Sequence, residues 1–462
     1  MKGAFMRTVF VAVLLWALAS VPVTAQKSGK SKVEKGEAAW SAVRIDWLMQ
    51  SPYGDDMSAR DGASVRLGGN QGKWVIDKDG AVGFTWGGKR HAVASEGQTL
   101  ELNVGGRAAG LAVYPDAAGV FHAFAADAMA CEVDGLSLLF IDANFNGKFL
   151  DHEHDRVAIG PRGAFAFPCA KVLPLIDASY SFKEGKGKLT WVKEEFASTD
   201  KARELHNALN KARMDMGLFP AECDAAANAA CQAHCEYMHS NDVMTHSQDK
   251  KLNGYTKEGD AAARTSVLTR KNTPTGAIGQ WLNQPLHGRD LRALWLTKAG
   301  FGFYEGFACL RTSGLSGTSF SVTRAAVFPP NDARDVPVTW ASGESPEPRQ
   351  DAGKTPGYPI TFSYDWGKPF LPRDLKATMF RKDGAEWKEV AVQVTAPGLN
   401  VPASMTGFKY AFVLPVEQLA ANTVYRLEIQ FQTEDREDGA IRTCFTTGSN
   451  SSPRSWNTAQ QR

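Results

Sequence analysis

The stretch DANFNGKFLDHE, residues 142–153, brings together side chains that could bind a metal ion. Asp or Asn stands at its first, third and fifth positions, Gly at its sixth and Glu at its twelfth. Calcium takes six to eight oxygen ligands, and alternate residues of a tight loop can turn their oxygens toward one ion. We therefore predict a calcium site in this loop. Its ligands would be the side chains of Asp142, Asn144, Asn146 and Glu153 and the main-chain carbonyl of Lys148.

The segments on either side of this loop are typical of strands. GLSLLFI precedes it, and HDRVAIGPRG leaves room for one brief strand before Gly and Pro. A helix–loop–helix calcium motif is therefore not expected, and the ion would stiffen a turn of a β domain. Leu150 at the ninth position and the small number of charged ligands predict weak, millimolar binding.

The same loop allows other interpretations. Asp151 or Asp155 could replace a standard ligand, and the loop could also be an Asn- and Gly-rich turn without an ion. A further alternative uses His152 and His154 as ligands of a transition metal.

The first residues of the chain are typical of an export signal. Lys2 and Arg7 precede the apolar run VFVAVLLWALA, and the small residues Val-Thr-Ala end at position 25. The run is too short to span a membrane, so residues 1–25 are predicted to be a cleaved signal peptide. We expect the mature protein to be secreted, periplasmic or at the cell surface, without a transmembrane segment.

Composition limits the classes of partner. Of the 462 residues, 43% are hydrophobic and 22% charged, which is typical of a globular protein. The net charge is +2, so no strong positive field predicts nucleic-acid binding.

Seven cysteines in an exported chain make disulfides an option. If cysteines pair within domains, Cys131 joins Cys169, and Cys444 is left unpaired. The four cysteines of the middle segment could form up to two further bridges, whose connectivity the sequence does not determine.

The pattern of apolar residues divides the chain into three folded segments. Residues 26–38 are a polar lead-in predicted to be disordered, and residues 39–195 alternate short apolar runs with turns such as DKDG, which indicates a β-rich domain. Residues 198–328 combine helices and strands. Residues 329–448 contain short alternating strands typical of a β-sandwich, and residues 449–462 form a polar tail predicted to be disordered.

Three helices are predicted in the middle segment. Residues 200–216 place apolar residues on one helical face, and Asp200 can cap the start of that helix. A second, Ala-rich helix is predicted from residue 222 to 239 and a third around residues 277–282.

The middle segment also carries an ordered set of short motifs. LHNALNKARMDMGLFP is followed by AACQAHCEYM, MTHS, WLNQPLH and GFGFYEG. This set, over about residues 200–312, resembles the CAP superfamily of cysteine-rich secretory, antigen 5 and pathogenesis-related proteins, in its bacterial form. The resemblance implies an α-β-α sandwich with helices on both faces of a small sheet. Further on, PPNDARDVPVTW and GYPITFSY resemble the bacterial Ig-like modules that often accompany exported CAP domains.

The CAP family has a shallow cleft that holds two histidines and two acidic residues. By position, the histidines correspond to His246 and His287 of this chain. The acids match less well, because Gln284 stands where many members have Glu and the family's Gly-Glu-Asn piece falls on residues 264–266, which contain no acid. Glu258 is the nearest carboxylate. A glycine also follows the second histidine, where the family usually has Arg.

Histidines in such a cleft allow several kinds of chemistry. Two neutral imidazoles can bind zinc or another divalent metal together with oxygen ligands, and an imidazole beside a water can catalyse hydrolysis. The cleft histidines could also be hydrogen-bonded for structure alone. Cys231, His234 and Cys235 offer an alternative zinc site, whereas His206 and His239 are expected on helix surfaces.

The sequence thus predicts a multidomain, secreted CAP-domain protein: a β-rich N-terminal domain, an α-β-α CAP domain and a C-terminal Ig-like β-sandwich. We expect it to act as a binding or scaffold protein for a cell-envelope or extracellular peptide, lipid or glycan. The missing acids favour this role over the alternative, a hydrolase that uses the cleft histidines. A purely structural surface protein is a third interpretation.

Overall fold

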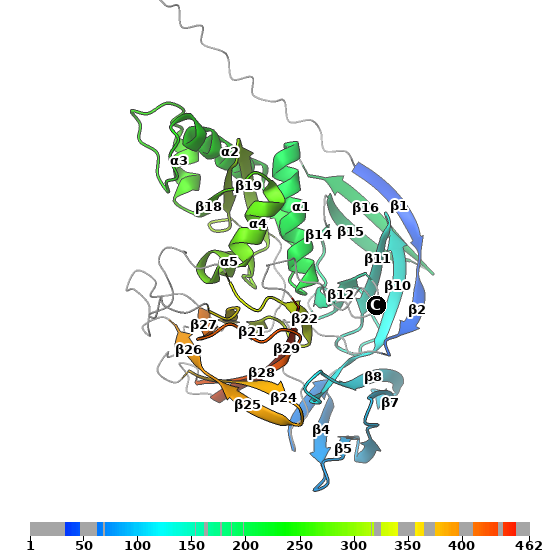
Figure 1. The fold of residues 1–462 in the computed structure, drawn as a ribbon. Coiled ribbons are helices and arrows are strands. Elements are labelled where there is room, and N and C mark those ends of the chain that lie inside the picture. The colour runs from blue at the N-terminus through cyan, green and yellow to red at the C-terminus, as the bar shows by residue number, and fades with distance from the viewer. Residues whose placement is uncertain are drawn as a thin grey trace, which may run out of the picture.

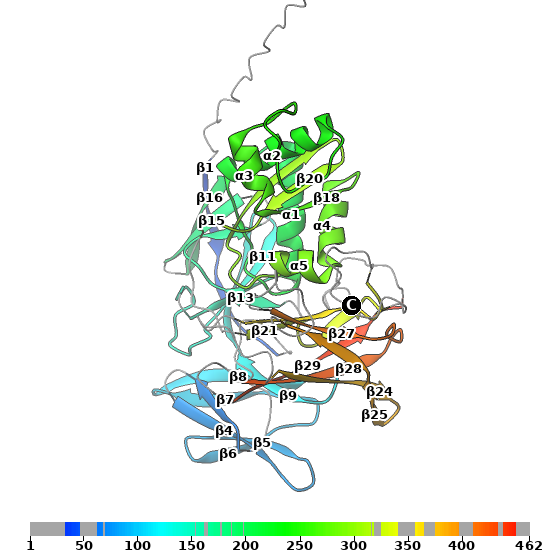
Figure 2. The same ribbon diagram turned by 90° about the vertical axis from the view of Figure 1, so that its left-hand side faces the viewer.

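The computed structural model describes most of the chain between residues 33 and 449 (Figures 1 and 2). The described residues are 33–46, 62–67, 70–152, 154–160, 165–175, 178–185, 187–196, 198–315, 317, 325–340, 356–364, 375–396, 410–432 and 438–449. The predicted signal peptide and C-terminal tail lie outside them. Among these residues, no helix is both long and apolar enough to cross a membrane.

Two sheets form the larger part of the N-terminal segment. The first contains, in spatial order, β1 (Val33–Ala39), β16 (Lys188–Glu195), β15 (Ala178–Gly185) and β14 (Leu173–Leu175). The second contains β13 (Ala166–Pro168), β12 (Arg156–Ile159), β11 (Leu136–Ile141), β10 (Asp127–Val133) and β2 (Ser41–Arg44). Apolar residues of both sheets, such as Phe140 and Leu189, belong to one buried cluster. The prediction of disorder for residues 26–38 is therefore wrong from residue 33 onward, because β1 pairs along its whole length with β16.

Two smaller sheets lie between β2 and β10 in sequence. One contains β3 (Ser64–Leu67), β4 (Asn70–Ile76), β5 (Val82–Trp86) and β6 (Lys89–Ala92), and the other β7 (Gln98–Val104), β8 (Arg107–Pro115) and β9 (Phe121–Ala125). Trp74, Phe84 and Leu111 belong to a second buried cluster, shared by these sheets and one face of the β10–β13 sheet. The predicted DKDG turn joins β4 to β5, with Gly80 at φ +86°.

The middle segment places helices on both faces of a four-stranded sheet. The strands are β17 (Glu222–Cys223), β19 (Lys298–Tyr304), β20 (Phe307–Arg311) and β18 (Ser266–Arg270). The helices are α1 (Asp200–Asp215), α2 (Ala225–Ser240), α3 (Lys257–Ala263), α4 (Pro274–Leu282) and α5 (Pro285–Leu291).

Side chains alternate between the two faces of this sheet. Leu268 and Phe307 share a buried cluster with α2 and α3, whereas Val267, Ala308 and Leu310 share another with α1 and α4. This alternation produces the three layers visible in Figure 2. The cap of α1 is Thr199, whose side chain accepts from Ala202 N, so Asp200 is the first helical residue rather than the predicted cap.

The last segment forms two further sheets. One contains β21 (Ala325–Phe328), β23 (Ile360–Tyr364), β27 (Tyr410–Pro415) and β26 (Val392–Thr395). The other contains β22 (Ala333–Val336), β29 (Asp438–Thr447), β28 (Val424–Gln432), β24 (Lys376–Asp383) and β25 (Glu386–Val390). Phe362 of the first sheet and Leu427 of the second belong to the same buried cluster as Phe140 of the N-terminal segment. The core is therefore continuous between segments.

The expected disulfides are absent from the structure. All seven cysteines are free thiols, including Cys131 and Cys169, which the sequence predicted to pair. The Cys169 thiol instead lies 3.6 Å from His152 Nδ1.

Candidate functional site

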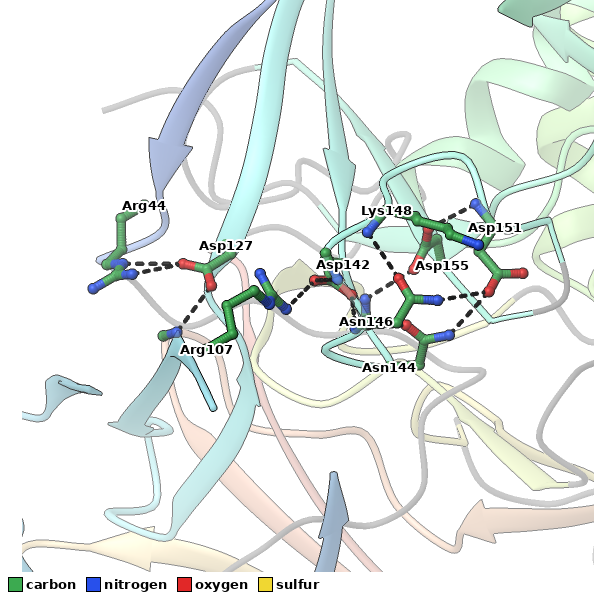
Figure 3. Close-up of polar contacts among 12 residues, drawn as sticks. Arg44, Arg107, Asp127, Asp142, Asn144, Asn146, Lys148, Asp151 and Asp155 are labelled. Carbon is green, nitrogen blue, oxygen red and sulfur yellow. Dashed lines mark hydrogen bonds and ion pairs between the residues drawn. The ribbon is translucent and has the colours of Figure 1, made fainter. Parts of the chain in front are cut away.

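The acidic loop between β11 and β12 is closed by hydrogen bonds to Asp142 (Figure 3). The Asp142 carboxylate, which is 1% exposed, accepts the main-chain N–H groups of Asn146 at 2.9 Å and Gly147 at 2.7 Å. The guanidinium of Arg107, on β8, donates to the same carboxylate at 2.8 Å. Phe145 and Gly147 have φ values of +60° and +81°, which give the loop its tight turn.

Two more carboxylates complete the loop. The amide groups of Asn144 and Asn146 point toward Asp151 and each donate to its Oδ2 at 3.0 Å (Figure 3). The Asp155 carboxylate is fully buried and accepts the main-chain N–H groups of Ala143 and Asp151 at 3.1 and 2.8 Å. Burial, and to a lesser degree the neighbouring Asp142 and Asp151, raises the pKa of Asp155 to about 7. The loop therefore concentrates negative charge that is only partly neutralised by Arg107.

The structure brings only some of the predicted ligands of this loop together. Asp142, Asn144 and Asn146 come together, and Asp151 and Asp155 join them. Lys148 contributes its N–H to Asn146 Oδ1 at 2.8 Å, and Glu153 lies outside the described residues. No three described His, Cys, Asp or Glu side chains are grouped closely enough to hold a metal ion by themselves.

The histidine pair next to the loop is separated. His152 turns toward the Cys169 thiol, and His154 is exposed.

His246, on the chain between α2 and α3, is an exposed imidazole fixed on one side. Its Nδ1 lies 3.0 Å from the main-chain carbonyl of Ala263 at the end of α3. Because a carbonyl only accepts, Nδ1 carries the proton of the neutral ring, and the lone pair is on Nε2. In this tautomer Nε2 can bind a metal or accept a proton, while the carbonyl orients the ring through the other nitrogen.

A buried network that the sequence did not predict holds the chain around His246. His234, on α2, donates from Nε2 to the Thr245 carbonyl at 2.9 Å, and its Nδ1 accepts from Gln248 Nε2 at 3.1 Å. Gln248 Oε1 accepts Thr256 N at 2.9 Å, and Gln248 N donates to Asp260 Oδ1 at 2.8 Å. Both ring nitrogens of His234 are thus engaged, and burial lowers its pKa. In this arrangement neither ring nitrogen of His234 is available to the zinc ion suggested for Cys231, His234 and Cys235.

The acidic residues near His246 are exposed or already paired. Glu258 is an exposed residue of α3. Asp260 accepts from Gln248 N and forms an ion pair with Arg264 at 3.1 Å. Residues 264–266, where the family's Gly-Glu-Asn piece was expected, contribute Arg264 to this ion pair and contain no carboxylate.

The second predicted histidine, His287, lies on α5 beside the C-terminal segment. Gln284 is the buried N-cap residue of this helix and makes no side-chain cap hydrogen bond. Gly288 is needed here because a Cβ would lie 2.7 Å from the Arg292 guanidinium and from the Trp281 carbonyl. Arg292 uses that space to reach Thr361 Oγ1 on β23, at 3.2 Å. The departure from the family's Arg at residue 288 thus accommodates an interdomain contact.

Comparison with known proteins identifies the middle segment. Residues 206–309 match the family model described as the cysteine-rich secretory protein family, CAP. With the α-β-α layers above, this match supports assignment of the segment to the CAP superfamily. A search of the curated proteins finds no match.

Solved structures give distant likenesses. An extracellular protein containing a SCP domain from Bacillus anthracis is 11% identical, over 54% of this chain and 87% of that one, with a TM-score of 0.21. A cysteine-rich secretory protein from Staphylococcus aureus is 11% identical, over 58% and 97%, with a TM-score of 0.17. PcoC, a copper resistance protein from Escherichia coli, is 18% identical, over 26% and 94%, with a TM-score of 0.18. Such low scores carry no argument about this chain.

Proposed function

We propose that this is an exported CAP-domain protein that binds or scaffolds a cell-envelope or extracellular peptide, lipid or glycan. The observation that carries the proposal is the environment of His246. The imidazole is exposed and oriented, but the acids of α3 are either exposed, as Glu258 is, or paired with Arg264, as Asp260 is. An oriented imidazole without a matching buried acid suits recognition of a ligand better than acid–base turnover.

The cleft imidazole can be tested with zinc as a probe ligand. Nε2 of His246 has the lone pair that a divalent metal requires, so we expect calorimetry of the whole mature chain to detect zinc binding. His246→Ala should weaken zinc binding at least about tenfold. A tenfold change corresponds to the loss of roughly 1.4 kcal/mol of binding free energy when one metal ligand is removed. His239→Ala, which removes an exposed histidine of α2, is the matched control. Equal zinc affinity in His246→Ala and the parent protein would remove the cleft-metal proposal.

The binding role needs a second measurement. The mature chain should cosediment with isolated peptidoglycan, or with lipid vesicles, or be retained by an envelope glycan, and His246→Ala should lower the bound fraction. Cosedimentation unaffected by His246→Ala would place the binding surface elsewhere on the molecule. Retention by none of these materials would contradict the binding role itself.

We further propose that calcium stabilises the acidic loop. The loop carries three carboxylates and two amide side chains that its hydrogen bonds hold in place, and the fully buried Asp155 has a raised pKa that a cation would lower again. The proposed ligands are those predicted from the sequence: side-chain oxygens of Asp142, Asn144, Asn146 and Glu153, and the Lys148 carbonyl. Asp151 would contribute a further carboxylate oxygen.

Calcium binding is tested by the melting temperature. Millimolar calcium should raise the melting temperature of the parent protein, and Asp151→Asn, which removes one charge at constant shape, should reduce that increase. Asp79→Asn, in the β4–β5 turn, is the control because its carboxylate also caps a turn, accepting from Ala81 N at 3.1 Å. If calcium has no effect on the parent protein, the loop is an ion-free turn.

The second candidate function is hydrolysis, and the His246 tautomer favours it. An Nε2 lone pair at an exposed position can accept a proton from water. Hydrolysis of a chromogenic ester or a peptide that is lost in His246→Ala and retained in His239→Ala would establish an enzyme. Activity that survives in His246→Ala would exclude this mechanism.

A further inference from the structure

Three thiols meet in the core of the CAP domain. Cys231 and Cys235 are one turn apart on α2, and Cys309 is on β20, which packs against that helix. All three are fully buried and belong to one cluster. The helical spacing of four residues places both α2 thiols on the face that covers the sheet.

Cys309 lies on the sheet face that α2 covers. It stands directly opposite Gly302 in the pairing of β19 with β20, Gly302 lies against the main chain of Cys231, and the three cysteines share one buried cluster. Cys231 Sγ additionally lies 3.6 Å from the Gly300 carbonyl and 4.0 Å from Ser266 Oγ. Cys309 is therefore the shared partner of two alternative pairs.

The backbones of α2 and the sheet are unusually close at this point. A Cβ at Gly302 would collide with the main chain of Cys231, and one at Gly300 would collide with Ala227. Glycines at these two positions of β19 let the helix approach the sheet. A disulfide needs its two Cα atoms within about 7 Å, a separation that such close packing of helix and sheet favours.

The other cysteines are arranged differently. Cys223 is half-buried and accepts from Asn228 Nδ2 at 3.0 Å, and Cys169 lies beside His152. Cys131 and Cys444 are on β10 and β29, in other segments. The three-thiol cluster of Cys231, Cys235 and Cys309 is thus a separate feature of the CAP domain.

We propose that this cluster is a redox site, in which oxidation joins Cys309 to either Cys231 or Cys235 and leaves the third thiol beside the bridge. Formation of the S–S bond releases two protons and two electrons from the two thiols. A disulfide oxidant, such as oxidised glutathione or an oxidised dithiol protein, takes up the electrons and is reduced to two thiols. Before the core closes, the remaining thiol can attack the bridge as a thiolate and exchange one pairing for the other, with release of the displaced thiol.

The timing of oxidation follows from burial. Burial raises the pKa of both Cys231 and Cys309 well above the ordinary thiol range, which suppresses the reactive thiolate in the folded protein. The bridge therefore forms while the chain folds in an oxidising compartment, and the finished core then shields it from small reductants. This proposal does not depend on what the CAP cleft binds.

The test is thiol counting after refolding of the full mature chain with oxidised and reduced glutathione. Under denaturing conditions, N-ethylmaleimide should label five of the seven cysteines, and reduction should restore the other two. Peptide mapping should join the Cys309 peptide to the α2 peptide, and the bridged protein should melt at a higher temperature than the reduced one.

Three single variants identify the partners. Cys231→Ser should retain a bridge through Cys235, and Cys235→Ser one through Cys231, whereas Cys309→Ser should lose the bridge entirely. Cys223→Ser, at the half-buried cysteine nearby, should leave the bridge unchanged. Labelling of all seven thiols after oxidative refolding would overturn the proposal, as would a bridge that persists in Cys309→Ser.

Discussion

Arg213 shows how a single buried charge can organise a domain. Its guanidinium, at 0% exposure, donates to four main-chain carbonyls at 2.5–3.1 Å. These carbonyls belong to Phe219, Leu291, Ala293 and Leu296. One arginine of α1 thereby supplies hydrogen bonds to main-chain carbonyls after α1, at the end of α5 and in the chain that follows α5. These are places where a buried main chain lacks regular helical partners.

Replacement of Arg213 should destabilise the protein strongly. Arg213→Met keeps much of the apolar stem but leaves four buried carbonyls without their donor, so we expect a loss of about 3 kcal/mol or more in the free energy of unfolding. Urea unfolding measures the loss. Lys211→Met, which removes the exposed lysine of an i,i+4 ion pair on the same helix, should change stability by less than about 1 kcal/mol. A similar small effect in both variants would contradict the structural role of Arg213.

His206 was predicted on a helix surface, and this prediction is wrong. The imidazole is fully buried between the rings of Phe196 and Phe301, and Nε2 donates to the Ala221 carbonyl at 2.7 Å. The sequence contained a signal for this, since His206 follows Ala202 by four residues and precedes Leu209 by three, on the apolar face. Burial lowers the pKa of His206 to about 4.

The low pKa of His206 predicts a loss of stability in acid. Between pH 6.5 and 4 the unfolded state binds a proton at this residue and the folded state does not. The stability that the neutral His206 contributes is therefore lost as pH falls. A shift from 6.5 to about 4 corresponds to about 3 kcal/mol. The stability difference between the parent and His206→Gln should therefore narrow by roughly that amount over this pH range. The raised pKa of Asp155 gives stability the opposite dependence on pH. Because Asp155 is present in both the parent and the variant, its contribution cancels in the difference between them.

At the scale of elements, the packing of α2 on β19 depends on a glycine. Gly302→Ala places a methyl group against the main chain of Cys231, which cannot move without moving the helix. We expect a loss of about 1–3 kcal/mol in the free energy of unfolding. Gly279→Ala is the matched control, because a Cβ at that position of α4 meets nothing within 4 Å and should stabilise the helix by up to about 1 kcal/mol. Equal effects of the two substitutions on the free energy of unfolding would show that the close packing at Gly302 does not determine stability.

Local patterns predicted some elements well and others not at all. α1, α2 and α4 were predicted because caps and apolar periodicity lie within single stretches of sequence. The network of Gln248 and His234 was missed, since the residues between α2 and α3 have no periodicity and the partners meet only in the folded chain. The loop ligands Asp142, Asn144 and Asn146 were found together for the opposite reason, because their spacing is local.

At the scale of the whole molecule, the CAP segment and the last segment share a core. Tyr410 of β27 is buried in the cluster formed mainly by α1, α4 and the CAP sheet. Its hydroxyl donates to the Arg289 carbonyl of α5 at 3.3 Å, and its ring lies 5.3 Å from that of Trp295. The helix that carries His287 is thus supported from outside its own segment, which motifs of the CAP region alone could not reveal.

This contact predicts that a change in β27 reaches α5. Tyr410→Ala removes both the ring and the hydrogen bond to Arg289, so the amides of α5 should exchange with solvent about tenfold faster or more, the effect of losing ~1.4 kcal/mol of local stability. Met379→Ala removes an equally buried side chain of the same segment, on β24 in the other sheet. It should accelerate exchange mainly in β24, β28 and β29. If both variants leave α5 exchange equally unchanged, the CAP domain opens independently of the C-terminal sheets, and the interface does not support the helix.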